Sequence, residues 1–565
     1  MLTPDYFYGK SDKLIEMYQE LEDWILQDIA MRLVASGSLS GTADRELWKL
    51  EQMGLHRQEI IKRISQLTGK SRNEVRRLLR ESVLTSFSDD ESILERLASV
   101  QPPLQNNAVI AVMNAELMKT FGELSNLTNT TIDQSQKNLL NLLNEVDFRV
   151  ASGLQSYSSA ICEVLDRYAE NGMNVNYPTG SRRSLEAAVR CCIVTSMNQT
   201  AAQVTNKYIV EAGAEYVLVS AHMGARHDKN NPTGLQSHDW WQGKVYKIRG
   251  ADPDAPNLLE ATGYDIDPQT GEGHVVNPLG LHGYNCRHSH KPWDKSLRNP
   301  YVDANGNPKI DVHESQQLYD LQQQQRAMER AIRKTKRQLL VKEQELKAYP
   351  DDENIRSDYD KLAYKLRMQN RKYGEFCAEN DLQRQYDRVK VAGFKKEQAK
   401  RANGRATTYK NEQYASYEAD IGKNMVSKSE FSKIMSDQSE KKLFTHYSDA
   451  IKRGDVSPLA DYGMYRRTAM ELQDKCVGLV TSNGVKLEKR SLHCVDRVIG
   501  SVEQRRNGIK VDDVVKTLTS PDVEIRPVRY SKTAASQKFI YRNAEVTINP
   551  VTKTLIQVNP HHREK

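Results

Sequence analysis

One histidine and several cations near the C-terminal end have residue types suited to phosphodiester chemistry. Cleaving RNA without a metal needs a base for the 2′-hydroxyl proton, an acid for the 5′-oxygen and cations for the developing charge. His493 has an ordinary pKa suited to proton transfer, and Arg497 follows one helical turn later. Three further cations could hold the phosphate: Arg505, Lys538 and Arg542. Ser536 and Thr547 could form hydrogen bonds to the phosphate or to the 2′-hydroxyl.

The charge of the chain is concentrated around these candidates. Residues 485–565 hold 16 Lys and Arg against 9 Asp and Glu, which equals the net charge of +7 of all 565 residues. Such a segment is suited to a polyanion, and Arg506, Arg529 and Arg542 are its expected nucleic-acid contacts. The segment lacks a carboxylate cluster for magnesium, so we expect no cofactor. A single histidine near a helix start is often structural, so binding without catalysis stays an alternative.

Two helices and a small sheet must position these residues. The sequence predicts helices at about 490–506 and 510–520, interrupted at Asn507-Gly508. Strand-like runs follow at 523–529, 537–541, 545–549 and 554–558. We therefore expect residues 481–565 to form a small α+β module.

A second group of chemically capable residues lies in a loop-rich stretch at 222–290, which holds seven of the 13 histidines. Cys286, His288 and His290, together with His222, His238 and His282, have side chains that can bind zinc. Only one cysteine is present, and Cys-x-His is an uncommon ligand spacing. The alternative is a hydrogen-bonded loop framework, so the presence of a metal is left open.

The rest of the chain reads as a multidomain, mostly α protein with long helical hairpins. Hydrophobic residues make up 38% and charged residues 27% of the sequence. No run approaches 18 apolar residues and no apolar signal core follows the first charges, so we expect no membrane span. The seven scattered cysteines indicate synthesis in a reducing cytoplasm.

Apolar periodicity and turn residues suggest domain boundaries. Residues 1–150 read as helices, with a break at Thr68-Gly69-Lys70 and a capping box from Ser71 to Glu74. A strand is expected at 216–220. A helical hairpin is expected at 301–395, where Gln325, Thr335 and Lys342 weaken the heptad seam. Residues 396–480 read as a linker and short helices, with 396–430 the loosely ordered part.

Composite motifs in the loop-rich stretch carry a family resemblance. They are His222, Gly224 and Arg226 in HMGAR, His238 with Trp241, Gln242 and Gly243 in HDWWQGK, and Asn285, Cys286, Arg287 and His288 in NCRH. These residues resemble the phage minor capsid protein 2 family, which is related to minor head proteins typified by phage Mu protein F. The resemblance implies an α+β core at 151–300 and a helical portal- or head-binding region at 1–150. It also implies a virion protein near the portal vertex, made in the host cytoplasm, with portal and capsid proteins as partners.

The C-terminal module resembles the phage-associated barnase, EndoU, colicin E5/D and RelE superfamily of metal-independent ribonucleases. That resemblance implies an RNase-like toxin or effector module with RNA as its partner. One alternative is a purely structural head-completion protein, whose basic module binds DNA or the portal without catalysis. Another is a bacterial polymorphic toxin that acts outside any virion.

Overall fold

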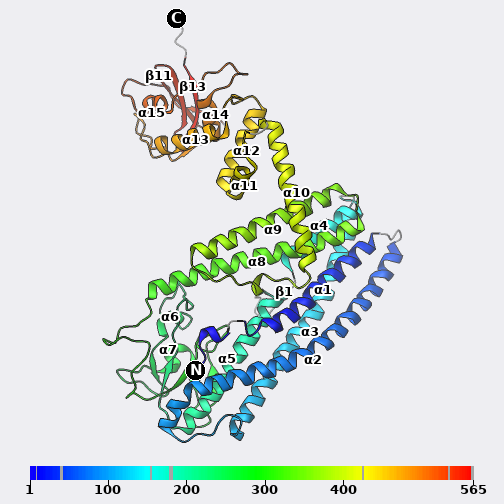
Figure 1. Cartoon of the computed structure of the whole chain (residues 1–565), viewed down its shortest axis with the longest axis vertical. Helices are drawn as coiled ribbons and strands as arrows, with labels where there is room; N and C mark the ends of the chain where they lie inside the picture. The colour runs from blue at the N-terminus through cyan, green and yellow to red at the C-terminus, as the bar shows by residue number, and fades with distance from the viewer. Residues whose placement is uncertain are drawn as a thin grey trace. The chain divides into compact units, whose positions relative to one another are not determined.

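The computed structural model describes residues 1–7, 9–37, 42–152, 155–172, 174–176, 182–422, 425–531 and 535–561. The chain divides into two compact units, Met1–Ala406 (unit 1) and Thr407–Lys565 (unit 2). Long helices make up most of unit 1, whereas unit 2 combines shorter helices with a small sheet (Figure 1). The prediction of a multidomain, mostly helical chain is confirmed at this level.

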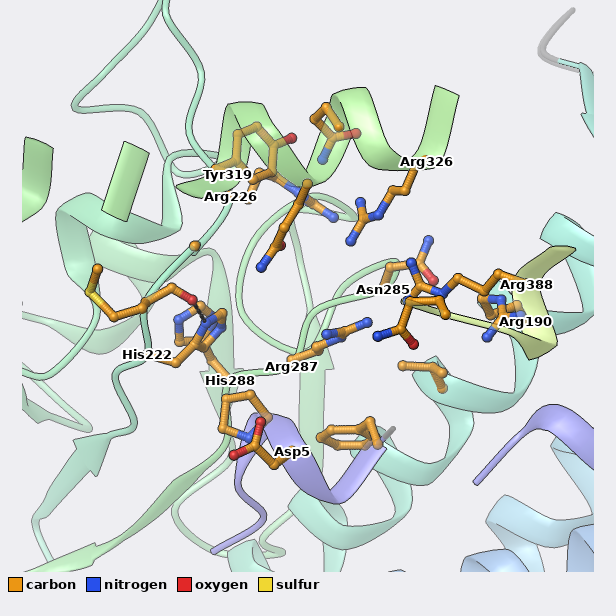
Figure 2. Close-up of a pocket in the computed structure, with 18 of the residues that line it drawn as sticks. Asp5, Arg190, His222, Arg226, Asn285, Arg287, His288, Tyr319, Arg326 and Arg388 are labelled. Atoms are coloured by element: carbon orange, nitrogen blue, oxygen red, sulfur yellow. Dashed lines mark hydrogen bonds between the residues drawn. The ribbon is translucent and has the colours of Figure 1, made fainter. Parts of the chain in front are cut away.

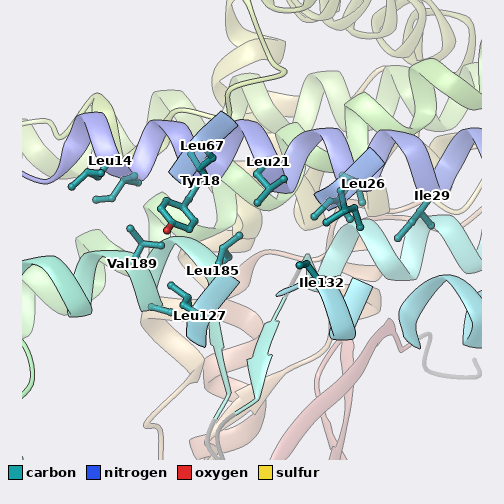
Figure 3. Packing of buried hydrophobic residues seen from close by; sticks show 14 of the residues in the cluster. Leu14, Tyr18, Leu21, Leu26, Ile29, Leu67, Leu127, Ile132, Leu185 and Val189 are labelled. Atoms are coloured by element: carbon teal, nitrogen blue, oxygen red, sulfur yellow. The ribbon is translucent and has the colours of Figure 1, made fainter. Parts of the chain in front are cut away.

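Unit 1 is built on long helices that share one apolar core. They are η1 (Pro4–Phe7), α1 (Asp12–Ser36), α2 (Thr42–Leu97), α3 (Asn107–Ala151), α4 (Tyr157–Asn171) and α5 (Leu185–Glu211). Leu14, Tyr18 and Leu21 of α1 lie over Leu185 and Val189 of α5 (Figure 3). This core fixes α5, which in turn supports the loop-rich stretch described below.

The predicted break at Thr68-Gly69-Lys70 is wrong, because α2 is one continuous helix through these residues. Leu67 and Val75, on either side of the expected break, are buried in the same core. A mid-helix glycine costs roughly 1 kcal/mol, which the burial of two apolar side chains outweighs. Ser71 is not an N-cap, since its hydroxyl donates to the carbonyl oxygen of Thr68 at 3.1 Å.

Short strands and loops follow α4 and α5. The elements are β1 (Asn174–Asn176), β2 (Arg182–Ser184), β3 (Tyr216–Val219), α6 (His238–Trp241), β4 (Val245–Lys247), α7 (Leu258–Thr262), β5 (Tyr264–Ile266), β6 (Gly273–Val275) and β7 (His290–Trp293). The strand β3, at the predicted place, is the centre of a three-stranded sheet with the order β4-β3-β7. Both pairings are antiparallel.

The predicted hairpin is formed by α8 (Val312–Ala348) and α9 (Glu353–Glu379), followed by η2 (Asp387–Val389). The polar residues that interrupt the heptad seam are buried and paired. Gln325 donates to the carbonyl oxygen of Gln383 at 2.8 Å. Lys342, only 3% exposed, donates to Asp166 of α4 and to Glu345, both at 2.7 Å. The hairpin therefore packs within its own chain.

The predicted linker at 396–430 is wrong for its first part, where α10 (Lys396–Ile421) forms. Ala402 and Ala406 are buried in the core of the α8–α9 hairpin, and Tyr414 and Ile421 are buried in the core of unit 2. These few buried residues are four to eight positions apart along an otherwise polar helix, so the helical repeat is hard to recognise in the sequence. The boundary between the two units falls within this helix.

The described part of unit 2 contains five helices after α10 and six strands, two more strands than expected. The elements are α11 (Lys428–Ser436), α12 (Gln438–Lys452), α13 (Tyr462–Cys476), β8 (Lys489–Arg490), α14 (Leu492–Ile499), α15 (Val511–Thr519), β9 (Glu524–Ile525), β10 (Arg529–Tyr530), β11 (Ala535–Tyr541), β12 (Ala544–Asn549) and β13 (Thr554–Pro560). The sheet order is β10-β11-β12-β13-β8, with β9 also paired to β11. Only the β13–β8 pairing is parallel.

Two features of unit 2 differ from the sequence-based expectation. The helix predicted at 490–506 ends at Ile499, because Gly500 turns the chain with φ 90°. The core of unit 2 also joins residues on both sides of 480, for example Tyr447 and Tyr465 with Val495, Phe539 and Val546. The β-sheet of residues 481–565 is thus packed on helices that precede it in the chain.

No helix in the described part of the chain combines the length and apolar character needed to cross a membrane.

Candidate functional site

The pairing of β3 with β7 brings the histidine-bearing loops together. His222 follows β3, and His238 opens α6, while Cys286 and His288 immediately precede β7. The two segments are joined beyond the strand ends, where Ser220 and Ser289 exchange hydrogen bonds of 2.8 and 3.0 Å. Residues far apart in the sequence therefore converge beside the core helix α5.

His238, Cys286 and His288 form what we call the cysteine–histidine cluster. The Nδ1 atoms of His238 and His288 are 3.3 Å apart, and the Cys286 Sγ lies 3.9 and 3.8 Å from them. All three side chains are buried. Burial lowers the pKa of His238 to about 3 and that of His288 well below its ordinary value, and it raises the pKa of Cys286 to about 11. The imidazoles are therefore neutral in the folded protein.

The outer nitrogens of both imidazoles are held by oxygen atoms. His238 Nε2 donates to the carbonyl oxygen of Leu279 at 2.7 Å, and His288 Nε2 donates to the Gln242 Oε1 at 3.0 Å. Gln242 Oε1 also accepts the backbone N–H of His222 at 2.9 Å, which fixes the orientation of the amide. Trp241 covers both rings, with centroid distances of 4.5 and 4.8 Å.

A second buried pair, His282 and His290, lies in the same loops. His282 Nε2 is 2.7 Å from His290 Nδ1, and the outer nitrogens contact the Oδ1 atoms of Asn198 and Asn206 at 3.0 and 2.8 Å. Asn206 also contacts the Tyr264 hydroxyl at 2.8 Å. Sequence reasoning missed both asparagines, although buried asparagines on the largely apolar helix α5 are a detectable signal.

The other motif residues shape the loops around these histidines. Gly224 and Gly243 adopt φ values of 69° and 71°, where a side chain is strained. Arg226 donates to the carbonyl oxygens of Leu279 and Tyr284 at 2.9 and 2.6 Å. Asn285 also has positive φ, and its N–H donates to Thr195 at 3.1 Å. His222 stacks on His288 at 4.4 Å between centroids.

A pocket of about 830 Å³ adjoins the cysteine–histidine cluster and is lined by both imidazoles. Its most abundant ionisable residues are arginines: Arg190, Arg226, Arg287, Arg326, Arg330, Arg333 and Arg388. Figure 2 shows Arg226, Arg287 and Arg326 directed into this space, with His222 and His288 to one side. Burial and the charges of Arg388 and Arg287 lower the pKa of Arg326 to about 10. The pocket is suited to an anion.

In unit 2 the structure brings His493 and Arg497 together. The Arg497 Nε donates to His493 Nε2 at 3.1 Å, and the His493 side chain is 40% exposed. Burial and the charge of Arg497 lower the pKa of His493. The half-exposed imidazole is therefore neutral near pH 7 and accessible from solvent.

Residues outside the predicted 481–565 module complete this site. Asp496, fully buried, lies beneath His493 with its Oδ2 at 3.5 Å from Nδ1. The same oxygen contacts His446 Nε2 of α12 at 2.9 Å, and Oδ1 accepts from the Tyr465 hydroxyl of α13 at 2.6 Å. We call His446, Tyr465, His493, Asp496 and Arg497 the Asp496 cluster. Arg506 adjoins it through a 3.3 Å bond to the Asp496 carbonyl oxygen.

The remaining candidates of unit 2 lie elsewhere. Gln537 and Phe539 of β11 are buried toward the core that α14 also enters, so the alternating Ser536 and Lys538 face the other side of the sheet. Thr547 of β12 lies opposite Lys538 of β11, and Lys538 donates to Glu545 at 2.8 Å. Three further arginines are exposed: Arg505 after α14, Arg529 on β10 and Arg542 in the β11–β12 turn. The structure does not assemble all of these residues with His493.

The comparison with family models decides the identity of the larger unit. The model of "Phage minor capsid protein 2" matches residues 2–376, about two thirds of the chain. The chain belongs to this family. The match includes every motif residue of the histidine-bearing loops and ends within α9. It supports a structural role in the phage head and a virion location, with other head proteins as partners.

Searches of curated proteins and of solved structures returned no match.

Proposed function

We propose that this minor capsid protein joins the phage head at the portal vertex, binding the portal protein through the helices of unit 1. The observation that supports this is a group of large apolar side chains exposed on α2 and α3. Leu47 and Leu50 are 71% and 69% exposed, and Phe148 is 71% exposed. Apolar side chains that gather on a surface commonly mark a protein contact.

The two helices that carry these side chains are joined at the same place. Lys49, which is 7% exposed, pairs with Asp147 and donates to the Asn144 side chain at 3.2 Å. Lys49 adjoins Leu50 in the chain, and Asp147 adjoins Phe148. These polar contacts of the buried Lys49 link the two helices beside the exposed apolar side chains, which favours a preformed docking face.

The test is copurification of the full chain with the portal protein of the same phage. The double variant Leu47→Glu/Leu50→Glu should lose at least tenfold in affinity, because charges would enter a desolvated contact. Leu459→Glu, an exposed leucine of unit 2 (87% exposed), is the matched control and should bind normally. Equal binding by all three proteins would refute this docking face.

Unit 2 supports a second function, which is metal-independent RNA cleavage. The supporting observation is the Asp496 cluster, which places two imidazoles on one buried carboxylate beside an arginine. The neutral, half-exposed His493 takes the 2′-hydroxyl proton on Nε2 as the 2′-oxygen attacks phosphorus, once Arg497 turns from this nitrogen to the phosphate. His446 is the candidate acid for the departing 5′-oxygen, and Arg497 stabilises the phosphorane charge.

In this proposal the other basic residues of unit 2 bind the RNA strand rather than react. Ser536, Lys538 and Thr547 lie on the opposite side of the sheet from α14, and Arg505, Arg529 and Arg542 are exposed. Binding should weaken with salt, because cations of the protein displace counterions from phosphates. The competing proposal is a unit that binds nucleic acid or the portal without chemistry.

Residues 407–565 incubated with tRNA in EDTA distinguish these proposals. His493→Ala should lower the cleavage rate by roughly 10² to 10⁴ while RNA binding persists. His561→Ala, a histidine outside the Asp496 cluster, should leave the rate unchanged. Because the pKa of His493 is lowered, the rate should fall on acidification only below about pH 6.5. Equally slow cleavage by wild type and both variants, with RNA binding retained, would favour binding without chemistry.

A further inference from the structure

The cysteine–histidine cluster of unit 1 has two nitrogen lone pairs that point at one another. Both Nε2 atoms face oxygen acceptors: a backbone carbonyl, which can only accept, and Gln242 Oε1, whose orientation is fixed by the His222 N–H. Each Nε2 therefore carries the proton of its neutral ring. The two Nδ1 atoms, 3.3 Å apart, are left without hydrogens, and the single Cys286 thiol proton can satisfy only one of them.

We propose that His238, Cys286 and His288 bind a divalent transition-metal ion, and that zinc is the ion their ligand set favours. Zinc bonds of about 2.0 Å to nitrogen and 2.3 Å to sulfur place tetrahedral ligands roughly 3.3 Å (N···N) and 3.6 Å (N···S) apart. The corresponding distances here are 3.3, 3.8 and 3.9 Å. A small contraction around the ion brings the sulfur into place.

The surroundings of the ligands are those of a metal site. Histidine ligands commonly donate their outer N–H to a carbonyl or amide oxygen, which fixes the ring and makes the inner nitrogen a better ligand. Leu279 and Gln242 supply those oxygens. Trp241 shields the rings from one side, and the pocket reaches both imidazoles from another. The fourth position is thereby left to water or to an anion from the pocket.

The second histidine pair does not have two ring nitrogens without hydrogens that face one another. His282 and His290 can be satisfied by protein alone. If the Asn206 amide donates to His290 Nε2, its oxygen accepts from the Tyr264 hydroxyl, and His290 Nδ1–H then donates to His282 Nε2. The cysteine–histidine cluster cannot be satisfied in this way. The Leu279 carbonyl oxygen can only accept a hydrogen bond, and the His222 N–H holds the Gln242 amide with its oxygen toward His288.

Metal binding would convert the Cys286 thiol into a thiolate, with one proton released to solvent. The thiolate halves the charge that the ion brings, and Arg226, which is close enough to act on Cys286 electrostatically, further favours the thiolate. The ion would join α6 to the segment before β7, in a region whose core is small and rich in loops. The expected role is structural, independent of portal binding and of RNA cleavage.

The test uses the full chain, stripped with a chelator and titrated with Co²⁺ as a spectroscopic stand-in for Zn²⁺. Wild type should take up one ion per chain, show a thiolate-to-cobalt charge-transfer band and release one proton. Cys286→Ser should lose the band and at least about 100-fold in affinity, and Gln242→Ala, which leaves the ligands in place, should lose 10- to 100-fold. Cys377→Ser, a buried cysteine in α9, is the matched control and should behave as wild type.

Metal analysis of the untreated wild-type protein keeps the proposal falsifiable if a variant fails to fold. One equivalent of zinc that survives dialysis supports the site. A wild-type protein that neither carries an ion nor binds Co²⁺ overturns it, as does a Cys286→Ser protein that binds Co²⁺ with an unchanged band.

Discussion

The two units of this chain are stabilised in different ways. Unit 1 buries polar side chains in the region matched by the family, where Asn198, Asn206 and four histidines hold the loops. The core of unit 2 instead contains a group of packed aromatic rings, such as Phe444, Tyr447 and Tyr462, among aliphatic side chains. In unit 1, buried polar groups therefore specify the loop structure. In unit 2, the aromatic core supplies stability, and the Asp496 cluster at its surface is available for chemistry.

The largest expected effect is a loss of cooperative folding when unit 2 is shortened to residues 481–565. Residues 407–565 should fold alone with a cooperative thermal transition, because their core is contained within that range. Residues 481–565 should not, because they lack Phe444, Tyr447, Tyr462 and Tyr465. Circular dichroism melting of the two fragments checks this. A cooperative transition in 481–565 would show that the helices before residue 480 are dispensable.

In unit 1, Asn198→Ala should lower the free energy of unfolding by about 2–4 kcal/mol. The amide of Asn198 donates to the carbonyl oxygens of Cys286 and His288 and accepts from His282, so alanine removes a hydrogen bond from each of three buried groups. All five tryptophans lie before residue 300, so tryptophan fluorescence in urea reports on unit 1. Asn230→Ala, at an exposed loop position, is the control. A loss below 1 kcal/mol would contradict the specifying role of these polar groups.

Removing one buried hydrogen bond from unit 2 should lower the free energy of unfolding by a smaller amount. Tyr465→Phe removes the hydroxyl that donates to the buried Asp496 carboxylate but keeps the ring in the core. We expect a loss of about 1.5–3 kcal/mol, the usual range for a hydrogen bond to a charged group. Urea unfolding of residues 407–565 measures it, with the exposed Tyr530→Phe as control. An effect as large as that of Asn198→Ala would remove the contrast between the units.

A further expected effect is a pH dependence of the stability of unit 1. Burial raises the pKa of Asp23 to about 7, although Gly393 N–H donates to its carboxylate at 2.7 Å. The folded state then binds a proton that the unfolded state has released. Stability is full below about pH 4 and falls as pH rises to about 7, by at most about 1.4 kcal/mol per pH unit. Asp23→Asn should flatten this slope in urea unfolding followed by fluorescence, whereas an unchanged slope would assign it to other groups.

Local sequence signals predicted most of the regular structure. Apolar residues at helical spacing located α1 and the α8–α9 hairpin, and strand-like runs bounded by turn residues located β3 and the strands β11, β12 and β13. Where tertiary packing competes with local preference, prediction failed. Packing of Leu67 and Val75 carries α2 through Gly69, and two alanines and a tyrosine anchor α10.

The sites depend on contacts that no local pattern contains. The family motif identified His238, Cys286 and His288, but only the β3–β7 pairing brings their nitrogen and sulfur atoms together. His446 and Tyr465 were missed because they lie on helices before the expected module and reach Asp496 through the tertiary fold. Within the predicted module, only the His493–Arg497 contact followed from sequence spacing, since one helical turn separates them.

The buried Lys342 has a consequence for how the helices of unit 1 find their alignment. Its ammonium is paired with Asp166 of α4 and with Glu345, in a place that is almost free of solvent. Sliding α8 by one turn against α4 would move the Lys342 ammonium about 5.4 Å away from Asp166 and leave it with Glu345 of its own helix as its carboxylate partner. A leucine seam alone would accept such a slip with little penalty. We therefore expect the Lys342–Asp166 pair to favour one alignment of α8 on α4, because only that alignment gives this buried ammonium both of its carboxylates.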